Sequence, residues 1–309
     1  MKKKILIIGG DGFLGKWLIK SLPKEKYEIS ILDPKLNIKK LKKYNIQYFF
    51  KFSTSNNKNL KKALHKVNWD YVVCLAAWGG NGNGLLKAAE ENFQEAMQVN
   101  VYNFRNILEE LKNNQQVKII WSSSTVVFGE ENYYKGKVIE NSELNPTTNY
   151  GLTKVIAEKI TKYYIKNYNM NIIGIRFPII IGPGLKYRGV ASGISDMAIF
   201  AKDFKKSKIP MVISVLDLIY IKDASSILLK IIKSHKKLNY IYNCPSYRTN
   251  AKNLSDTFNK SINSNVISIK NIGIGSTYPI MNSTLIKNDL KFKLQYNLKK
   301  TVNDWLKIL

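Results

Sequence analysis

The stretch Ile5-Leu-Ile-Ile-Gly9-Gly-Asp-Gly12-Phe-Leu-Gly15 decides the fold of this chain. Its apolar start predicts a buried strand, and an amphipathic stretch begins where the glycines end. A strand that passes through a glycine-rich turn into a helix is the context of a dinucleotide-binding site. Gly9 would permit the tight turn, Gly12 would let the backbone approach a pyrophosphate, and Gly15 would let the helix pack closely on the sheet. The N–H groups at the start of that helix would face the phosphates.

Short apolar runs and amphipathic stretches alternate through the first half of the chain. We expect strands at residues 5–8, 28–32, 46–52, 71–76, 118–121 and 171–175, and helices at 13–21, 36–43, 58–66, 92–111 and 149–167. Strands that alternate with helices predict a parallel sheet covered on both faces, with right-handed crossovers. Residues 79–84, rich in glycine and asparagine, predict a loop at the carboxyl edge of that sheet, where open α/β folds bind their ligands.

The pattern weakens after Gly182-Pro-Gly184, which breaks the chain. Beyond it we expect a strand within residues 212–221 and helices at 223–233 and 301–309. The fold class predicted is therefore α/β, a Rossmann-type doubly wound parallel sheet in residues 1–181. Residues 182–309 are expected to form mainly a small, interleaved C-terminal lobe that binds the substrate, with part of it, at about 212–233, returning to the sheet domain.

A carboxylate ends the second predicted strand. Asp33 follows the glycine turn at the distance, about 20 residues, where such a group accepts hydrogen bonds from both ribose hydroxyls of NAD. It would repel the 2′-phosphate of NADP. The next residues, Pro34 and Lys35, include no arginine to hold that phosphate. The sequence therefore favours NAD as the cofactor.

A tyrosine and a lysine, Tyr150 and Lys154, are one turn apart on a predicted helix and so share one face. A free tyrosine hydroxyl has a pKa of about 10. A neighbouring ammonium favours the phenolate, which suits the tyrosine to acid–base catalysis. Lys154 could also hydrogen-bond the nicotinamide ribose. Ser124, just past the fifth predicted strand, could hold the hydroxyl or carbonyl oxygen of a substrate during hydride transfer.

In this order and spacing the motifs resemble those of extended short-chain dehydrogenases/reductases of the NAD-dependent epimerase/dehydratase family. The resemblance covers nearly the whole chain and is carried by Asp33 and by residues 9–15, 70–77, 100–103, 122–129, 150–154, 176–178, 182–184 and 219–224. Residues 122–124 are three serines, as in sugar-nucleotide 4-epimerases. The resemblance implies that Ser124 is the catalytic hydroxyl, Tyr150 the acid–base and Lys154 its partner.

The resemblance also implies contacts to the cofactor and the substrate. Phe13 and Leu14 would approach the pyrophosphate, and Asn100 would lie near the nicotinamide half. The other expected cofactor contacts are Ser53 at the adenine and Leu75, Ala76, Ala77 and Phe177 along the cofactor. The expected substrate contacts are Trp78, Ser124, Arg188 and Arg248, of which the two arginines are candidate clamps on a diphosphate or else plain surface charges. The helices predicted at 92–111 and 149–167 resemble those that pair into a dimer interface in this family, so we expect a homodimer.

The chain departs from the family pattern at several positions. Thr125 and Val126 follow Ser124, where the dehydratases that it resembles carry Asp-Glu. Loss of water from a sugar needs a positioned acid, so 4,6-dehydration is disfavoured. Ile179 and Leu216 stand where an asparagine and an arginine usually contact the nucleotide diphosphate. We expect an NAD-dependent sugar-nucleotide epimerase that removes and returns hydride at a sugar carbon, C4 by the resemblance. The alternative is an NAD-dependent sugar-nucleotide dehydrogenase or 4-keto reductase.

The net charge of +27 is nearly all lysine, scattered along the chain. This favours codon bias and solvated faces over a polyanionic partner, although a nucleic-acid-binding or regulatory protein on a dinucleotide-binding fold stays an alternative. No apolar run approaches the length of a membrane span. Two cysteines, and no cluster of residues with metal-ligand spacing, predict neither a disulfide framework nor a metal site. We expect a cytoplasmic protein.

Overall fold

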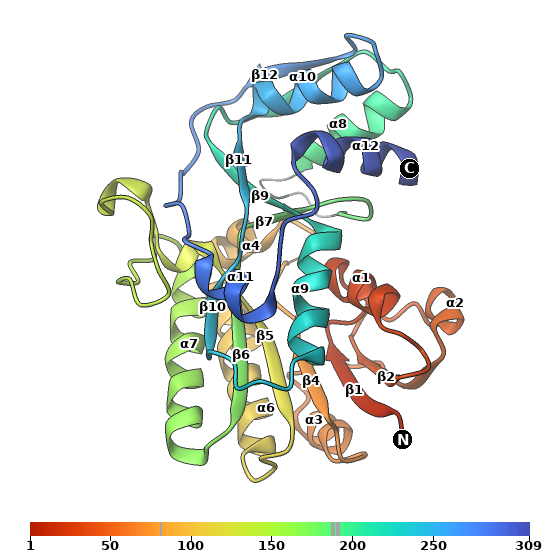
Figure 1. Ribbon diagram of the computed structural model, residues 1–309, viewed down its shortest axis with the longest axis vertical. Helices are drawn as coiled ribbons and strands as arrows, with labels where there is room; N and C mark the ends of the chain where they lie inside the picture. The colour runs from red at the N-terminus through yellow and green to blue at the C-terminus, as the bar shows by residue number, and fades with distance from the viewer. Residues whose placement is uncertain (81, 187–188, 190–191) are drawn as a thin grey trace.

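The computed structural model describes residues 1–80, 82–186, 189 and 192–309. A sheet domain with flanking helices carries a smaller lobe beyond the carboxyl edge of its strands (Figure 1). The chain starts at the opposite edge of the sheet and ends in the lobe. The α/β fold class predicted from the sequence is confirmed.

Within the described residues, the main sheet has seven strands, all parallel, in the order β10-β6-β5-β4-β1-β2-β3. These strands are β1 (Lys3–Ile8), β2 (Tyr27–Leu32), β3 (Ile46–Phe50), β4 (Tyr71–Cys74), β5 (Lys118–Ser124), β6 (Asn171–Phe177) and β10 (Ile241–Asn243). The chain builds the sheet outward in one direction from β1 to β3 and in the other from β4 to β10. The reversal lies between β1 and β4, where Ile8 pairs with Cys74. Doubly wound sheets bind their ligands at this switch point.

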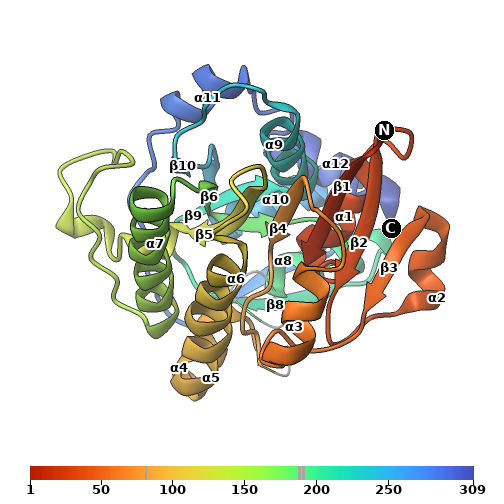
Figure 2. The same ribbon diagram turned by 90° about the horizontal axis from the view of Figure 1, so that it is seen from below.

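Helices cover both faces of the main sheet (Figure 2). One face carries α1 (Phe13–Ser21), α9 (Ile221–Lys233) and α11 (Thr284–Leu290), and the other carries α3 (Asn57–Leu64), α6 (Asn103–Leu111) and α7 (Asn149–Tyr168). Successive residues of a strand point to opposite faces, so Ile7 enters the first layer while Ile8 enters the second. Because both layers are apolar, β1 is a continuous apolar run rather than an alternating one.

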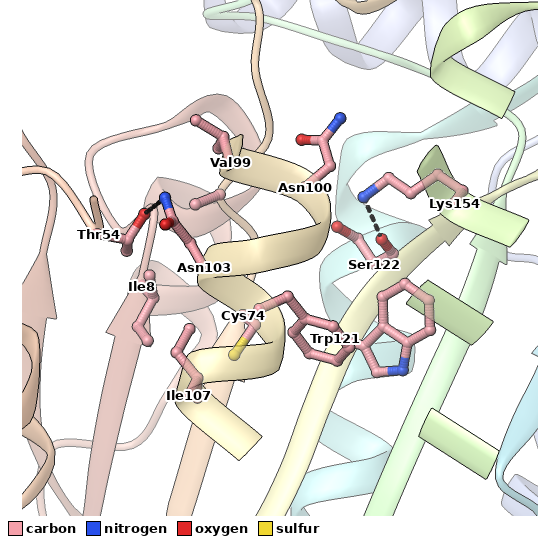
Figure 3. A pocket seen from close by; sticks show the side chains of 12 residues that line it. Ile8, Thr54, Cys74, Val99, Asn100, Asn103, Ile107, Trp121, Ser122 and Lys154 are labelled. Carbon is pink, nitrogen blue, oxygen red and sulfur yellow. Dashed lines mark hydrogen bonds between the residues drawn. The ribbon is translucent and has the colours of Figure 1, made fainter. Parts of the chain in front are cut away.

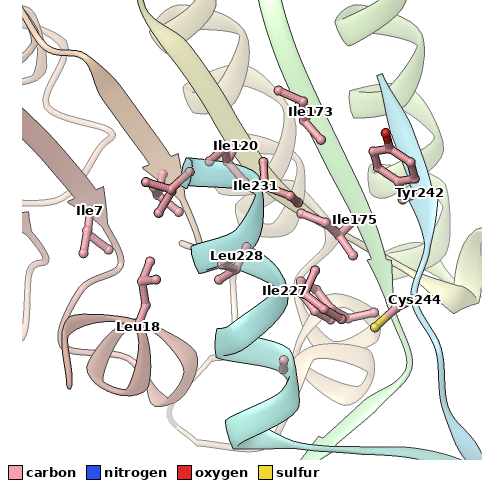
Figure 4. Close-up of a cluster of buried hydrophobic side chains, with 14 of the residues drawn as sticks. Ile7, Leu18, Ile120, Ile173, Ile175, Ile227, Leu228, Ile231, Tyr242 and Cys244 are labelled. Carbon is pink, nitrogen blue, oxygen red and sulfur yellow. The ribbon is translucent and has the colours of Figure 1, made fainter. Parts of the chain in front are cut away.

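The first layer shows how the sequence pattern becomes packing (Figure 4). Leu18 of α1 and Leu228 of α9 face Ile7 and Ile120 of the sheet, and all four side chains are fully buried. The helix that starts at the glycine turn is therefore fixed on the sheet by α9, a segment that lies two hundred residues later in the chain.

The lobe is built from the second half of the chain. Its elements are β7 (Ile179–Ile181), α8 (Ser192–Lys202), β8 (Ser207–Met211), β9 (Leu216–Tyr220), β11 (Tyr247–Thr249), α10 (Ala251–Ser261), β12 (Ile267–Asn271) and α12 (Leu298–Ile308). Strands β11, β9 and β7 form one sheet, and β12 pairs with β8. Phe13, the first residue of α1, packs against the apolar core of the lobe. The glycine turn thus lies where the two parts of the molecule meet.

Some elements differ from the sequence prediction. The helix expected at 36–43 is only α2 (Ile38–Leu41) with a 3₁₀ turn after it, and the helix expected at 92–111 is interrupted. It consists of α5 (Phe93–Met97), a π-helical turn (Gln98–Tyr102) and α6. A π turn shifts the face of a helix by one residue, and a turn of five residues is too short for the apolar pattern to reveal that shift.

The lobe and the sheet domain interleave more than the sequence suggested. Helix α9 returns to the main sheet, in the segment where a return was expected, whereas β9 belongs to the small sheet of the lobe. Strand β10 and helix α11, which were not predicted, also lie on the main sheet. Both are short, and a strand of three residues is too short to show a period. The domain boundary at residue 182 stays a prediction.

Candidate active site

The glycine turn after β1 lies directly against the loop that follows β4. Gly9 has φ of +83°, a left-handed conformation that favours glycine. A Cβ on Gly9 would come within 2.7 Å of Ala76 N, and a Cβ on Gly15 within 2.5 Å of Gly9 O. The three glycines therefore keep open a cradle that larger residues would fill. This geometry fits the pyrophosphate of a dinucleotide at the switch point.

Helix α1 opens onto this cradle. Gly12 precedes the helix, and glycine has no side chain to cap it, so the first N–H groups and the positive end of the helix dipole can serve an anion. Phe13 packs against the core of the lobe and Leu14 against the first layer of the sheet domain. Their side chains are thus directed into packing, and their backbone N–H groups are the ones suited to a pyrophosphate.

Asp33 lies just after β2 and is only 9% exposed. Its Oδ2 accepts a hydrogen bond from Asp11 N (3.2 Å) and its Oδ1 one from Lys35 N (2.9 Å). Burial raises the pKa of Asp33, and these backbone bonds oppose that rise. Each carboxylate oxygen has a second lone pair, so the oriented group can still accept a ribose hydroxyl. The Asp11 carboxylate, which the sequence analysis did not assign, forms an ion pair with Lys16 (2.7 Å) and adds negative charge beside Asp33.

We expect NAD to bind at least about tenfold more tightly than NADP, a difference of about 1.4 kcal/mol. The reason is that the 2′-phosphate of NADP would meet the carboxylates of Asp33 and Asp11. Asp33→Ala should narrow this difference, which calorimetric titration of both cofactors would measure. Asp203→Ala, which removes an exposed carboxylate of the lobe, is the matched control and should leave it unchanged. Equal or tighter binding of NADP by the unaltered protein would contradict the assignment.

Ser124 and Tyr150 both lie at the carboxyl edge of the sheet, on either side of one short turn. Ser124 is the last residue of β5, and its Oγ accepts a long hydrogen bond from Val126 N (3.5 Å) in the 3₁₀ turn Thr125–Val127. Helix α7 begins against this turn, because a Cβ on Gly151 would come within 2.6 Å of Val126 O. Tyr150, 6% exposed, packs with Val126 in one apolar cluster. The strand end and the helix start therefore bring both hydroxyl groups to one region.

Lys154 follows Tyr150 by one helical turn and lies on the same face of α7. Its Nζ donates a hydrogen bond to Ser122 O (2.8 Å; Figure 3). The same atom lies 5.5 Å from the centre of the Tyr150 ring. Burial lowers the pKa of Lys154 to about 8, while Cys74 and Glu158 act in the opposite direction. An ammonium at this distance favours the phenolate of Tyr150. The spacing of four residues thus produces the juxtaposition that the sequence predicted.

Asn100 connects the loop after β4 to α7 by hydrogen bonds of its side chain. Its Oδ1 accepts a hydrogen bond from Trp78 N (2.9 Å), and its Nδ2 donates one to Thr153 Oγ1 (3.1 Å). Trp78 packs in the apolar cluster that contains Tyr150 and is flanked by α4 (Leu85–Glu91). The remaining residues expected at the cofactor differ in burial. Ser53 after β3 is exposed, Leu75, Ala76 and Ala77 after β4 are half-buried, and Phe177 at the end of β6 is buried. All of these positions lie at the carboxyl edge of the sheet.

The structure describes only one of the two arginines expected at a diphosphate. Arg248 on β11 donates two hydrogen bonds to Asp217 (3.2 and 2.8 Å), one to Glu131 Oε1 (2.6 Å) and one to Tyr278 O (2.8 Å). Its role as a clamp stays a prediction, and it would require the guanidinium to release one of these partners. Arg188 lies outside the described residues.

Sequence reasoning missed a buried ion pair beside Ser123, the neighbour of Ser124. Glu158 Oε1 accepts a hydrogen bond from Ser123 Oγ (2.7 Å), and both carboxylate oxygens accept from Arg176 (2.9 and 2.7 Å). The side chains of Glu158 and Arg176 are 3% and 2% exposed. One signal was available, since Glu158 follows Lys154 by one helical turn and so shares its face. A glutamate on a face that must be buried requires a partner.

Other kinds of site have no support in the described part of the chain. No group of three or more histidine, cysteine, aspartate or glutamate residues there could hold a metal ion. Among the same residues, no helix has the length and apolar character needed to span a membrane.

Comparison with known proteins identifies the family. Residues 5–244 match the model of the NAD dependent epimerase/dehydratase family. The chain belongs to this family. It is 29% identical over 228 residues to a putative UDP-glucose 4-epimerase of Methanocaldococcus jannaschii, which covers 72% of this chain and 70% of that relative. It is 26% identical over 193 residues to the UDP-glucose 4-epimerase of Mycoplasma genitalium, and this match spans 60% of the chain and 55% of the relative.

Solved structures agree on the fold. The UDP-glucose 4-epimerase of Thermus thermophilus, solved with NAD, superposes with a TM-score of 0.83 at 16% identity over 98% of both chains. The L-threonine dehydrogenase of Clostridium difficile gives 0.82 at 24% identity over 99% of this chain and 97% of that one. The predicted recognition, fold and cofactor are confirmed: this member of the epimerase/dehydratase family is an NAD-dependent enzyme of the extended short-chain dehydrogenase/reductase type. The roles of individual residues stay predictions.

Proposed function

We propose that this enzyme is a sugar-nucleotide epimerase that inverts C4 of the sugar. The observation that carries the proposal is that Lys154 Nζ lies 5.5 Å from the centre of the Tyr150 ring, while Tyr150 packs with Val126 in the turn that begins directly after Ser124. One relative is named as a UDP-glucose 4-epimerase and another as a putative one, which supports a UDP-hexose as substrate.

Each residue has a chemical task in this proposal. When bound, NAD supplies the acceptor for a hydride. Tyr150 takes the proton of the substrate hydroxyl through its phenolate oxygen, and Ser124 orients the same substrate oxygen by a hydrogen bond. Lys154 stabilises the phenolate by its charge. The proton returns from Tyr150 to the substrate oxygen once the configuration at the carbon has changed.

The surroundings of Ser124 favour epimerisation over dehydration. The next two residues, Thr125 and Val126, are 6% and 5% exposed and carry no carboxylate. Removal of water from the sugar needs an acid near the departing hydroxyl. Thr125 and Val126 cannot supply such an acid. Hydride transfer at one carbon, with proton transfer at its oxygen, is therefore the better fit.

The test separates the epimerase from a dehydrogenase or a 4-keto reductase. Purified enzyme is incubated with UDP-glucose or UDP-galactose in deuterated water, and the products and the absorbance of NADH are followed. We expect each sugar to be converted into the other, with no deuterium at C4 and no build-up of free NADH. NADH formed in proportion to product would instead identify a dehydrogenase. Turnover that occurs only with a 4-keto sugar and added NADH would identify a reductase.

We also propose a homodimer that forms through α6 and α7. A surface groove of about 310 Å³ lies between these helices, lined by Arg105, Glu109, Ile160, Tyr163, Tyr164 and Tyr168. Tyr163 is 55% exposed although its ring lies edge-on to both Tyr164 and Tyr168. An exposed aromatic side chain beside an open groove between two helices is typical of a protein–protein interface.

A cytoplasmic location is proposed from the cysteines. Cys74 and Cys244 are both free thiols in the interior, and burial raises the pKa of Cys74 to about 12. Unreactive buried thiols suit a reducing compartment.

A further inference from the structure

The π-helical turn between α5 and α6 has a specific geometric consequence. A π turn closes through hydrogen bonds between residues five apart, and here Asn103 N–H donates to Gln98 O. The side chains of the same two residues are hydrogen-bonded to each other at 2.8 Å. The turn thus rotates the start of α6 by one residue relative to α5. π turns inside helices occur frequently at functional sites.

As a result, two buried asparagines reach two different loops of the cofactor edge. Asn100, 3% exposed, holds the loop after β4 through Trp78 N. Asn103, 1% exposed, is hydrogen-bonded to Thr54 Oγ1 (2.9 Å) and Ser55 Oγ (3.0 Å) in the loop after β3. In either orientation of its amide, Asn103 stays within hydrogen-bond distance of both hydroxyls.

The loop after β3 is the one that adjoins Asp33. Asp33 N donates to Phe50 O at the end of β3 (3.1 Å), so the loop after β3 starts beside the residue assigned to the ribose. The family resemblance implies that Ser53 of this loop contacts the adenine, which makes residues 53–55 the candidate loop beside the base. Ser53 and Ser55 are exposed, whereas Thr54 is 6% exposed and points inward to Asn103 (Figure 3). The Thr54–Asn103 contact is the buried anchor of an otherwise exposed loop.

We propose that Asn103 is a positioning residue for the cofactor, which fixes the loop of residues 53–55 at the adenine end of the NAD site. A cavity of about 20 Å³ is lined by Asn103 and Thr54 on one side and by Asn100 and Lys154 on the other (Figure 3). The π turn thus places the anchors of the adenine side and of the catalytic side on one rigid element. The inference rests on NAD binding by this family and is independent of which sugar is the substrate.

The test measures binding of cofactor fragments rather than turnover. AMP and nicotinamide mononucleotide are titrated calorimetrically into the full chain and into Asn103→Ala. We expect AMP affinity to fall about tenfold, the size of one lost hydrogen-bond anchor, and nicotinamide mononucleotide affinity to stay within twofold. Hydrogen exchange at the amides of residues 53–57 should rise in the variant.

Two further variants control the result. Asn106→Ala removes the next asparagine on the same face of α6, which hydrogen-bonds Asn57 at the surface (3.1 Å), and should leave AMP affinity within twofold. Thr54→Val removes the partner hydroxyl but keeps the side-chain shape, and should reproduce the loss. The double variant Asn103→Ala/Thr54→Val should then lose little more than either single variant.

Unchanged AMP affinity in both Asn103→Ala and Thr54→Val would overturn the proposal. So would an equal loss of both fragments, since that result would show general damage to the site. If Asn103→Ala does not fold, the AMP affinities of Thr54→Val and Asn106→Ala are compared instead. A loss in Thr54→Val alone supports the proposal, and equal affinities overturn it.

Discussion

Replacement of Tyr150 by phenylalanine is expected to lower turnover by about 10²- to 10⁴-fold, the usual size of general acid–base catalysis. The ring is 6% exposed and packs with Val126, so phenylalanine keeps the packing and removes only the hydroxyl. NAD affinity should stay within a few-fold, because the cofactor is assigned to the glycine turn and Asp33. Steady-state turnover with a UDP-hexose and calorimetric titration of NAD measure the two effects separately.

The same helix supplies a control for this prediction. Tyr164 also lies on α7, and its hydroxyl donates to Glu109 Oε2 (2.6 Å) at a distance from the cofactor edge, so Tyr164→Phe should leave turnover nearly unchanged. Lys154→Met should reduce both turnover and NAD affinity, since Lys154 is assigned to the phenolate and to the ribose. If Tyr150→Phe kept near-normal turnover, the mechanism proposed here would be wrong.

The fold could be predicted because its signals are local. Continuous apolar runs such as residues 5–8 and the glycine turn after them each specify one unit, and repetition of such units determines a doubly wound sheet. The short strand β10 and helix α11 escaped prediction because neither is long enough to show a period. Their positions depend on contacts with segments distant in sequence, which no local pattern contains.

In the candidate site, likewise, contacts within one element could be predicted from the sequence, and contacts between distant elements could not. Spacing within one helix predicted that Lys154 lies beside Tyr150, and the structure places them so. The partners that orient the site come from separate elements: Glu158 meets Arg176 of β6, and Asn103 meets Thr54 after β3. The hydrogen bonds of Arg248 with Asp217 and Glu131 likewise depend on the pairing of β11 with β9 and on a loop that follows β5. Such pairings need the fold before they can be recognised.

The largest effect on stability is expected from breaking the buried ion pair of Arg176 and Glu158. Arg176 also donates to Glu140 O (3.0 Å) and Asn243 Oδ1 (3.3 Å), so one guanidinium joins β6, α7, β10 and the loop after β5. Arg176→Met would leave the carboxylate of Glu158 buried without a countercharge. The free energy of unfolding should fall by about 3–5 kcal/mol, a large part of the total of about 5–15 kcal/mol for a folded protein. Urea denaturation of the full chain measures this change.

Two variants distinguish loss of the buried pair from loss of any ion pair. Lys112 and Glu109 form an ion pair of similar length (2.6 Å) whose side chains are 27% and 33% exposed, so Lys112→Ala should cost less than about 1 kcal/mol. The double variant Arg176→Met/Glu158→Leu replaces both charges by apolar side chains and should recover much of the stability lost in Arg176→Met, because no uncompensated charge is left in the interior. If Arg176→Met also loses turnover, and the double variant recovers stability but not turnover, the pair orients Ser123 and, through it, the neighbouring Ser124. If Arg176→Met were no less stable than Lys112→Ala, the pair would not hold these elements together.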